Sequence, residues 1–160
     1  QGTAYFKSGK TTEFVNNLKA QLAKNPNDAS NWYNLGVLQS KDPATEADAL
    51  ASYKKAVEIN PNLAVAWQNL TYMVMGDDPK AVDDYNDARK AGKIEQANKI
   101  IEARRARLAA TLPYAEKWYE SDSNNIDAVS LLRGLYLSNK KDAKYQEFKA
   151  KEEAMKAAKK

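Results

Sequence analysis

The sequence predicts an all-α chain built from repeated, antiparallel helix pairs, and three observations carry that prediction. Trp32 and Trp67 lie 35 residues apart, and Pro26 and Pro61 share the same offset. A period of this length indicates stacked supersecondary units rather than one closed globule. Only 6 glycines and 5 prolines occur among 160 residues. The abundant Ala, Leu, Lys and Glu are residues that favour helix almost throughout.

The stretch from Trp32 to Pro61 carries the pattern most completely. It reads Trp32-Tyr33-Asn34-Leu35-Gly36, a polar turn with Asp42-Pro43, then Ala49-x-x-x-Tyr53-x-x-Ala56, and it ends at Asn60-Pro61. These residues resemble the tetratricopeptide repeat, whose Trp-x-x-Leu-Gly, Ala-x-x-x-aromatic and terminal Pro positions they fill. The resemblance implies a right-handed α-solenoid that serves as a protein-binding scaffold. It does not identify the partner.

Helix start and stop signals place the first elements. Residues 1–27 resemble the back part of a repeat, with an amphipathic helix over 13–24 that ends before Pro26, because the residue before proline is pushed out of the α region. The first complete repeat spans 28–62. Its first helix starts from a cap at Asp28 or Ser30 and runs to about Ser40, and the second runs from Pro43 to Ile59.

The next repeat, 63–124, departs from the pattern. Its first helix runs from Leu63 to about Met75, and Gly76 stops it. Two parses fit the residues after Gly76. Either 78–91 is the second helix and 93–121 is an extra one, or residues 76–105 hold an inserted helical segment and 106–121 is the second helix. The distance from Trp67 to Val129 is 62 residues, one period plus 27, which favours the insertion.

The last part, 125–160, predicts a helix from Ile126 to Leu137 and a terminal helix whose inner face carries Tyr145, Phe148 and Met155. Beyond about Ala150 the apolar content falls, as expected of the polar capping helix that ends a stacked array. This order of parts resembles tetratricopeptide proteins of Bacteroidetes-type bacteria, in which an extended helix pair precedes a segment like Leu112-Pro113-Tyr114. The whole chain is therefore expected to form a single tetratricopeptide-like domain.

Composition limits the possible functions. The net charge is +4, and the tail from Lys140 accounts for all of it with 8 lysines against 4 acidic residues, so no basic stripe for nucleic acid is expected. The chain has no cysteine and no histidine, which removes thiol chemistry, the commonest general base and the commonest transition-metal ligand. We expect no cofactor, no metal and no membrane span. The compartment stays open: cytoplasmic, or periplasmic if an export signal preceded Gln1.

Few residues are candidates for catalysis. Asp77-Asp78 and Asp83-Asp84 are carboxylate pairs near a predicted helix start, where Asp commonly caps the helix or complements its dipole. Arg104, Arg105 and Arg107 offer positive charge for a phosphate, but with Glu102 nearby they fit a solvated helix face better. Phosphate loops and nucleophile elbows are absent. The sequence therefore predicts a protein that is not an enzyme.

The resemblance implies that binding takes place in a concave groove lined by the first helix of each pair. A peptide or helix laid in such a groove meets aromatic, apolar and hydroxyl side chains. The tyrosines of this set fit packing between neighbouring repeats equally well. Two other hypotheses are self-association, through the N-terminal half-repeat or the insertion, and an accessory role within a longer protein. The expected groove residues are Phe6, Lys7, Tyr33, Val37, Ser40, Gln68, Asn69, Tyr72 and Met75.

Overall fold

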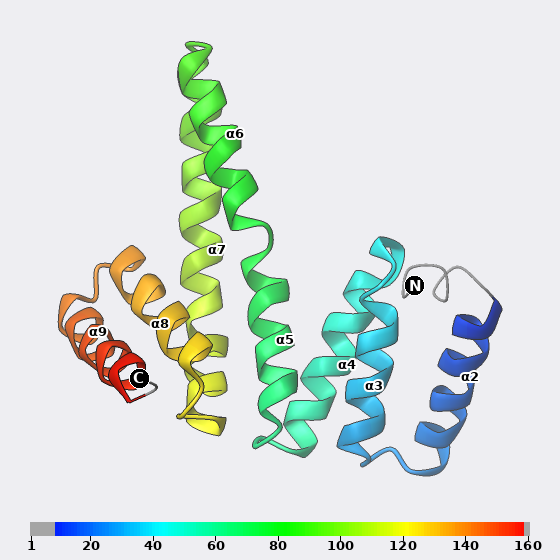
Figure 1. Cartoon of the computed structure of the whole chain (residues 1–160). Coiled ribbons are helices and arrows are strands. Elements are labelled where there is room, and N and C mark those ends of the chain that lie inside the picture. The colour runs from blue at the N-terminus through cyan, green and yellow to red at the C-terminus, as the bar shows by residue number, and fades with distance from the viewer. Residues whose placement is uncertain (1–8, 159–160) are drawn as a thin grey trace. The chain divides into compact units, whose positions relative to one another are not determined.

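A computed structural model describes residues 9–158, which form two compact units, one ending at Leu70 and the other beginning at Thr71 (Figure 1). Residues 9–158 form helices joined by short turns and contain no strand, so the all-α prediction is confirmed for that range. The first unit holds α2 (Gly9–Lys24), α3 (Ala29–Gln39), the short 3₁₀ helix η1 (Pro43–Thr45), α4 (Glu46–Ile59) and the beginning of α5 (Ala64–Met75). The second unit holds the end of α5, then α6 (Asp78–Lys90), α7 (Ile94–Ser121), α8 (Ile126–Ser138) and α9 (Asp142–Ala157).

Polar caps fix where the helices begin. Asp28 accepts a hydrogen bond from the backbone N–H of Asn31 at 2.9 Å, so Asp28 rather than Ser30 caps α3. Asp42 caps η1 in the same way, by accepting a hydrogen bond from the backbone N–H of Ala44 at 2.9 Å. Each cap satisfies a backbone donor that the first helical turn leaves without an intrahelical partner.

The 35-residue period reappears as a repeated hydrogen bond. The indole Nε1 of Trp32 donates to the carbonyl oxygen of Pro26 at 2.8 Å, and that of Trp67 donates to Pro61 at 2.8 Å. In both places the tryptophan is in the first turns of a helix and the proline is in the preceding turn. The bond ties each helix to the loop that leads into it, and this explains why the two residue types share one offset.

The α3–α4 pair is held close by small residues. A Cβ added at Gly36 would lie 2.8 Å from ring carbons Cδ1 and Cε1 of Tyr53, which is nearer than non-bonded carbon atoms approach. Ala49 and Ala56 on α4 are completely buried. The absence of a side chain at Gly36 therefore lets the Tyr53 ring lie against the backbone of α3.

In the second unit α7 has two different partners along its length. Its first half pairs with α6 in an antiparallel hairpin, which we call the arm (residues 78–103) and which extends beyond α8 and α9 (Figure 1). The helix then continues through Pro113, and its second half packs against α8. Gly92, at φ +71°, occupies the left-handed region in the α6–α7 turn, where glycine is favoured.

The second half of α7 forms the core of this unit with α8 and α9. The predicted inner face of the terminal helix is confirmed, since Phe148 is buried and both Tyr145 and Met155 pack against the core. Rings of Tyr119 and Tyr136 meet Phe148 edge-on, with centroids 5.0 and 5.1 Å away. The buried cluster consists of Leu108, Leu112, Ala115, Val129, Leu132, Leu135, Tyr136 and Phe148.

Candidate functional site

The predicted groove residues fall into three sets in the structure. Phe6 and Lys7 lie outside the described residues. Tyr72 and Met75 belong to the second unit. The first unit contains Tyr33, Val37 and Ser40 on α3 together with Gln68 and Asn69 on α5.

Within the first unit, three of these side chains meet at Tyr53, which α4 supplies. The rings of Tyr33 and Tyr53 have centroids 5.8 Å apart and planes tilted by 43°. Side chains of Ser40 and Asn69 are hydrogen-bonding partners of the Tyr53 phenol. The contact at Gly36 that brings the Tyr53 ring against α3 thus also places its hydroxyl beside the polar side chains of Ser40 on α3 and Asn69 on α5.

The burial of Tyr53 lets it hold neighbouring side chains in place but leaves it little surface for contact with a ligand. Its side chain is only 2% exposed. Burial raises the pKa of the phenol above its usual value, and the hydrogen bonds with Ser40 and Asn69 partly offset that rise. The phenol therefore stays protonated near neutral pH and acts as a fixed hydrogen-bonding group. In the sequence, Tyr53 stands only at the aromatic position of the repeat motif, which does not show where its hydroxyl points.

The two groove candidates of the second unit already make packing contacts. The Tyr72 ring lies edge-on to Trp118, with centroids 5.6 Å apart and an interplanar angle of 63°, and 42% of its surface is exposed. The Met75 side chain packs against the core cluster, and its carbonyl oxygen accepts a hydrogen bond from Arg107 Nε at 3.2 Å. Tyr72 combines packing with an exposed face, whereas Met75 is mainly a packing residue.

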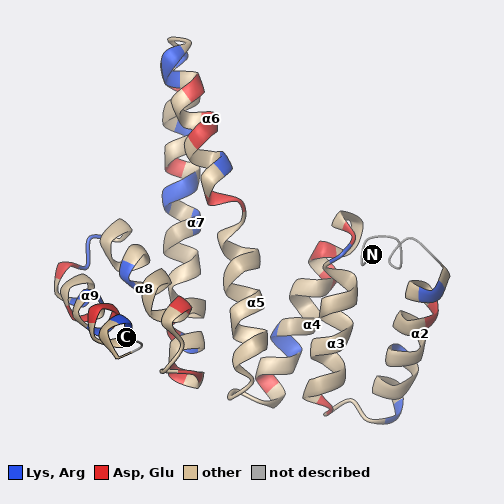
Figure 2. Cartoon of the chain, viewed as in Figure 1, with Lys and Arg blue, Asp and Glu red and all other residues tan. Residues whose placement is uncertain are grey.

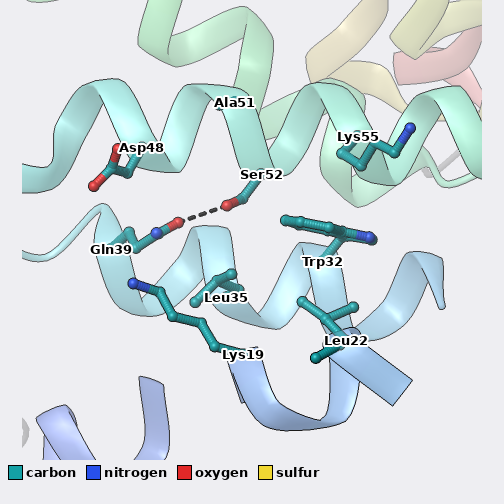
Figure 3. Close-up of a pocket in the computed structure, with 10 residues that line it drawn as sticks. Lys19, Leu22, Trp32, Leu35, Gln39, Asp48, Ala51, Ser52 and Lys55 are labelled. Carbon is teal, nitrogen blue, oxygen red and sulfur yellow. Dashed lines mark hydrogen bonds between the residues drawn. The ribbon is translucent and has the colours of Figure 1, made fainter. Parts of the chain in front are cut away.

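A pocket of about 610 Å³ opens on a different face of α3 (Figure 3). Its floor includes Leu22 and Leu35, and Trp32 flanks it. Gln39 and Ser52 are buried at the pocket and bind each other, with the Ser52 hydroxyl donating to Gln39 Oε1 at 2.6 Å. This pocket was not predicted from the sequence. The only available signal was the spacing of Trp32, Leu35 and Gln39 along one helix face, which core packing explains as well.

The acidic and basic candidates have structural partners. Asp77 caps α6 by accepting from the N–H of Lys80 at 3.0 Å, as the capping interpretation predicts. Asp78 takes two hydrogen bonds from Arg104, from Nε and Nη2, each 2.8 Å long. Arg104 and Asp78 are mostly buried, with 24% and 21% of their side chains exposed. The solvated-face prediction is therefore wrong for Arg104, because its partner comes from the neighbouring helix.

The far end of the second unit carries an ionic cluster around Glu152. This carboxylate is buried although α9 is mostly polar, and Lys156 and Arg133 both pair with it. Arg133 Nε lies 2.9 Å from Glu152 Oε2, but its N–H is not aligned for a hydrogen bond, so the contact is ionic. The hydrogen bond from Lys156, with smaller contributions from Ser130 and Arg133, holds the pKa of Glu152 below its usual value.

The described residues provide neither a metal site nor a membrane span. Among residues 9–158 no group of three or more acidic, histidine or cysteine side chains is placed to hold a metal ion. None of the helices in the described part of the chain has the length and apolar content needed to cross a membrane.

Comparisons with known proteins give little further guidance. No protein-family model matches the sequence, and no curated protein matches it. A solved structure described as "MamA RS-1 ArsTM double mutant" is similar at 14% identity and a TM-score of 0.38, over 93% of this chain and 86% of that one. A TM-score this low carries no argument about fold or function. What the structure defines is therefore a class, an all-helical protein of antiparallel helix pairs.

Proposed function

We propose that this protein is a non-enzymatic scaffold that binds a segment of another protein on the face shared by α3 and α5. The observation that carries this proposal is the group of Tyr33, Ser40 and Asn69 around the buried Tyr53 phenol. Because a buried tyrosine holds them, these partly exposed groups are ordered before a ligand arrives. Such preorganisation reduces the entropy that binding costs.

The repeated Trp–Pro hydrogen bond supports the tetratricopeptide resemblance on which the groove proposal depends. In that arrangement α3 and α5 are the first helices of successive pairs. On α3, Tyr33 and Val37 are both partly exposed, although the Tyr33 ring also contacts Tyr53 of α4. A ligand segment there finds an aromatic ring, an apolar side chain and an amide, which together suit backbone and side-chain recognition of a peptide.

We also infer that the insertion parse of residues 63–124 is the correct one. Near its C-terminal end α5 contacts the second half of α7, through Tyr72 with Trp118 and through Met75 with Arg107. These two contacts support placing the end of α5 beside the second half of α7, while the first half of α7 packs against α6. The arm is then an addition to the repeat and is free to serve a separate purpose.

The test is a selection from a random peptide library displayed on phage, with the purified chain as the target. Peptides enriched on the wild type should bind the Tyr33→Ala and Asn69→Ala variants at least tenfold more weakly. Lys54→Ala, an exposed position on α4, is the matched control and should bind as the wild type does. Circular dichroism checks that each variant keeps its helicity.

Two results would contradict the proposal. One is a selection that enriches no peptide over the bare support. The other is peptides that the Tyr33 and Asn69 variants bind as tightly as the control does, which would place the binding surface elsewhere, for example at the pocket beside Trp32.

A further inference from the structure

The pocket beside Trp32 has an uncharged central helix with charged residues on both sides. Helix α3 packs against both α2 and α4 and carries no charged residue between Ala29 and Gln39, whereas α2 and α4 supply the charged residues that line the pocket (Figure 2). Trp32 and Leu22 lie at one end of the pocket, and Gln39 and Asp48 lie at the other (Figure 3). The pocket therefore has an apolar end and a polar end.

At the polar end, Gln39 has one hydrogen-bonding atom that the protein does not use. Its side chain is buried, and its Oε1 accepts a hydrogen bond from the Ser52 hydroxyl at 2.6 Å. Its Nε2 has no acceptor among residues 9–158. The fully enclosed side-chain atoms that lack a partner in this range belong to arginines, so Gln39 Nε2 remains accessible from the pocket. A buried donor without an acceptor costs free energy, and a ligand that supplies the acceptor removes that cost.

Two charged side chains flank this amide. Lys19 on α2 and Asp48 on α4 both line the pocket, and neither forms an ion pair or a hydrogen bond within the described part of the chain. Together with Gln39 they also line an adjoining hollow of about 340 Å³, and in Figure 3 the amide lies between the ammonium group and the carboxylate. Lys55 lines the pocket too, but it already pairs with Glu58 at 3.0 Å. The polar end thus offers one amide donor, one cation and one anion.

We propose that this pocket binds a free α-amino acid with an apolar side chain. The ligand carboxylate accepts a hydrogen bond from Gln39 Nε2 and pairs with Lys19, while the ligand ammonium group pairs with Asp48. The ligand side chain lies against Trp32 and Leu22 at the apolar end. One small molecule thereby satisfies all three polar groups, and charge-assisted hydrogen bonds are the strong kind. The pocket lies on a different face of α3 from the peptide-binding surface, so this inference does not depend on that proposal.

Ligands that carry only part of this charge pattern fit the polar end less well. An apolar amine leaves Gln39 and Lys19 without an acceptor. An apolar carboxylate brings a second negative charge beside Asp48, and like charges at close range repel. A residue inside a longer peptide has neither charge, because its amino and carboxyl groups are both in amide bonds. The two opposite, unpaired charges therefore favour a zwitterion over these other apolar ligands.

Isothermal titration calorimetry with L-phenylalanine measures the proposed binding directly. The pocket volume of about 610 Å³ is in the range of small-molecule sites. Because a small ligand has few atoms that contribute free energy, we expect a dissociation constant of roughly 0.1–1 mM. Phenethylamine, 3-phenylpropionate and N-acetylphenylalanine amide keep the same ring and should each bind about tenfold more weakly. Failure of L-phenylalanine to bind at millimolar concentration, or an analogue that binds equally well, overturns the proposal.

Two variants test the charged groups separately. Asp48→Asn should weaken L-phenylalanine binding about tenfold and leave 3-phenylpropionate binding at least as strong, because a repulsive charge is removed. Lys19→Gln should weaken the binding of both these ligands and leave that of phenethylamine unchanged. The matched controls are Glu46→Gln, an exposed acid in the same first turn of α4, and Lys24→Gln, an exposed lysine of α2, and both should bind every ligand as the wild type does. Variants that weaken all ligands equally, or none, overturn the assignment.

Nuclear magnetic resonance locates the ligand on the chain. In a ¹H–¹⁵N spectrum, L-phenylalanine should shift the side-chain amide of Gln39 and the indole N–H of Trp32, which line the pocket, but not the indole N–H of Trp67. The Tyr33→Ala and Asn69→Ala variants should bind L-phenylalanine as the wild type does, so this site and the peptide-binding surface can fail independently. Shifts confined to Tyr33 and Asn69 overturn the placement in the pocket.

Discussion

Replacing Gly36 by alanine tests the close contact between α3 and α4 on which the candidate surface depends. The new Cβ would meet three ring carbons of Tyr53, at 2.8, 2.8 and 3.1 Å. Tyr53 is 2% exposed, so its ring can move only by displacing the residues packed around it. Gly134, inside α8, is the matched control, because a Cβ there meets nothing within 4 Å.

The two substitutions should have opposite signs. Alanine in a helix interior is favoured over glycine by about 1 kcal/mol, and Gly134→Ala should gain that amount. At Gly36 the same gain opposes an overpacking cost of about 1–3 kcal/mol, so the variant should be less stable than the wild type by about 1 kcal/mol. The difference between the two variants is then roughly 2 kcal/mol, well above the error of a denaturation experiment.

Urea denaturation followed by far-ultraviolet circular dichroism measures both changes. Tyr53→Leu, which removes the ring, should by itself destabilise the protein but should reduce the cost of Gly36→Ala when the two are combined. That coupling identifies the ring as the source of the clash. A Gly36→Ala variant as stable as Gly134→Ala, or one whose effect is simply additive with Tyr53→Leu, would refute the reasoning.

Three further predictions concern polar contacts. Trp32→Phe removes the indole hydrogen bond to the preceding turn and should lower the free energy of unfolding by about 1 kcal/mol, measured by urea denaturation. Lys156 holds the pKa of Glu152 below its usual value. The stability that this carboxylate contributes is therefore present above its unfolded pKa and is lost as the pH falls through the folded pKa. The Glu152→Gln variant should lose less of its free energy of unfolding than the wild type between about pH 5 and pH 3. A double-mutant cycle with Asp78→Asn and Arg104→Gln should give a coupling of about 1 kcal/mol, and hydrogen exchange should be faster in the arm of both single variants.

The positions of the helices could be predicted from the sequence because their signals are local. Asp28 and Asp77 bond to backbone groups three residues away, and prolines end or begin helices through their own rings and missing N–H groups. Such effects need no knowledge of distant parts of the chain. The helix before Pro26 was the exception, since it extends back to Gly9, before the predicted start at Glu13.

The candidate surface could be predicted only in part. Helical spacing identifies Tyr33 and Ser40 as neighbours on α3 but does not show what holds them. Their common partner, Tyr53, is on the next helix, and its hydroxyl reaches them only because Gly36 admits the ring. The assignment of these residues to a binding groove stays a prediction until a ligand is tested.

The helical class, the period and most helix boundaries were already decided by the sequence, since all of these follow from interactions between residues close along the chain. Which side chains pair across helices was decided by the tertiary structure. The partner of Arg104 is 26 residues away at Asp78, so no local pattern distinguishes it from the exposed Arg105 beside it. Tertiary structure also decided which apolar residues remain uncovered. Val82 and Ile94 are of the same types as core residues elsewhere, and only the packing of alanines between α6 and α7 leaves them facing water.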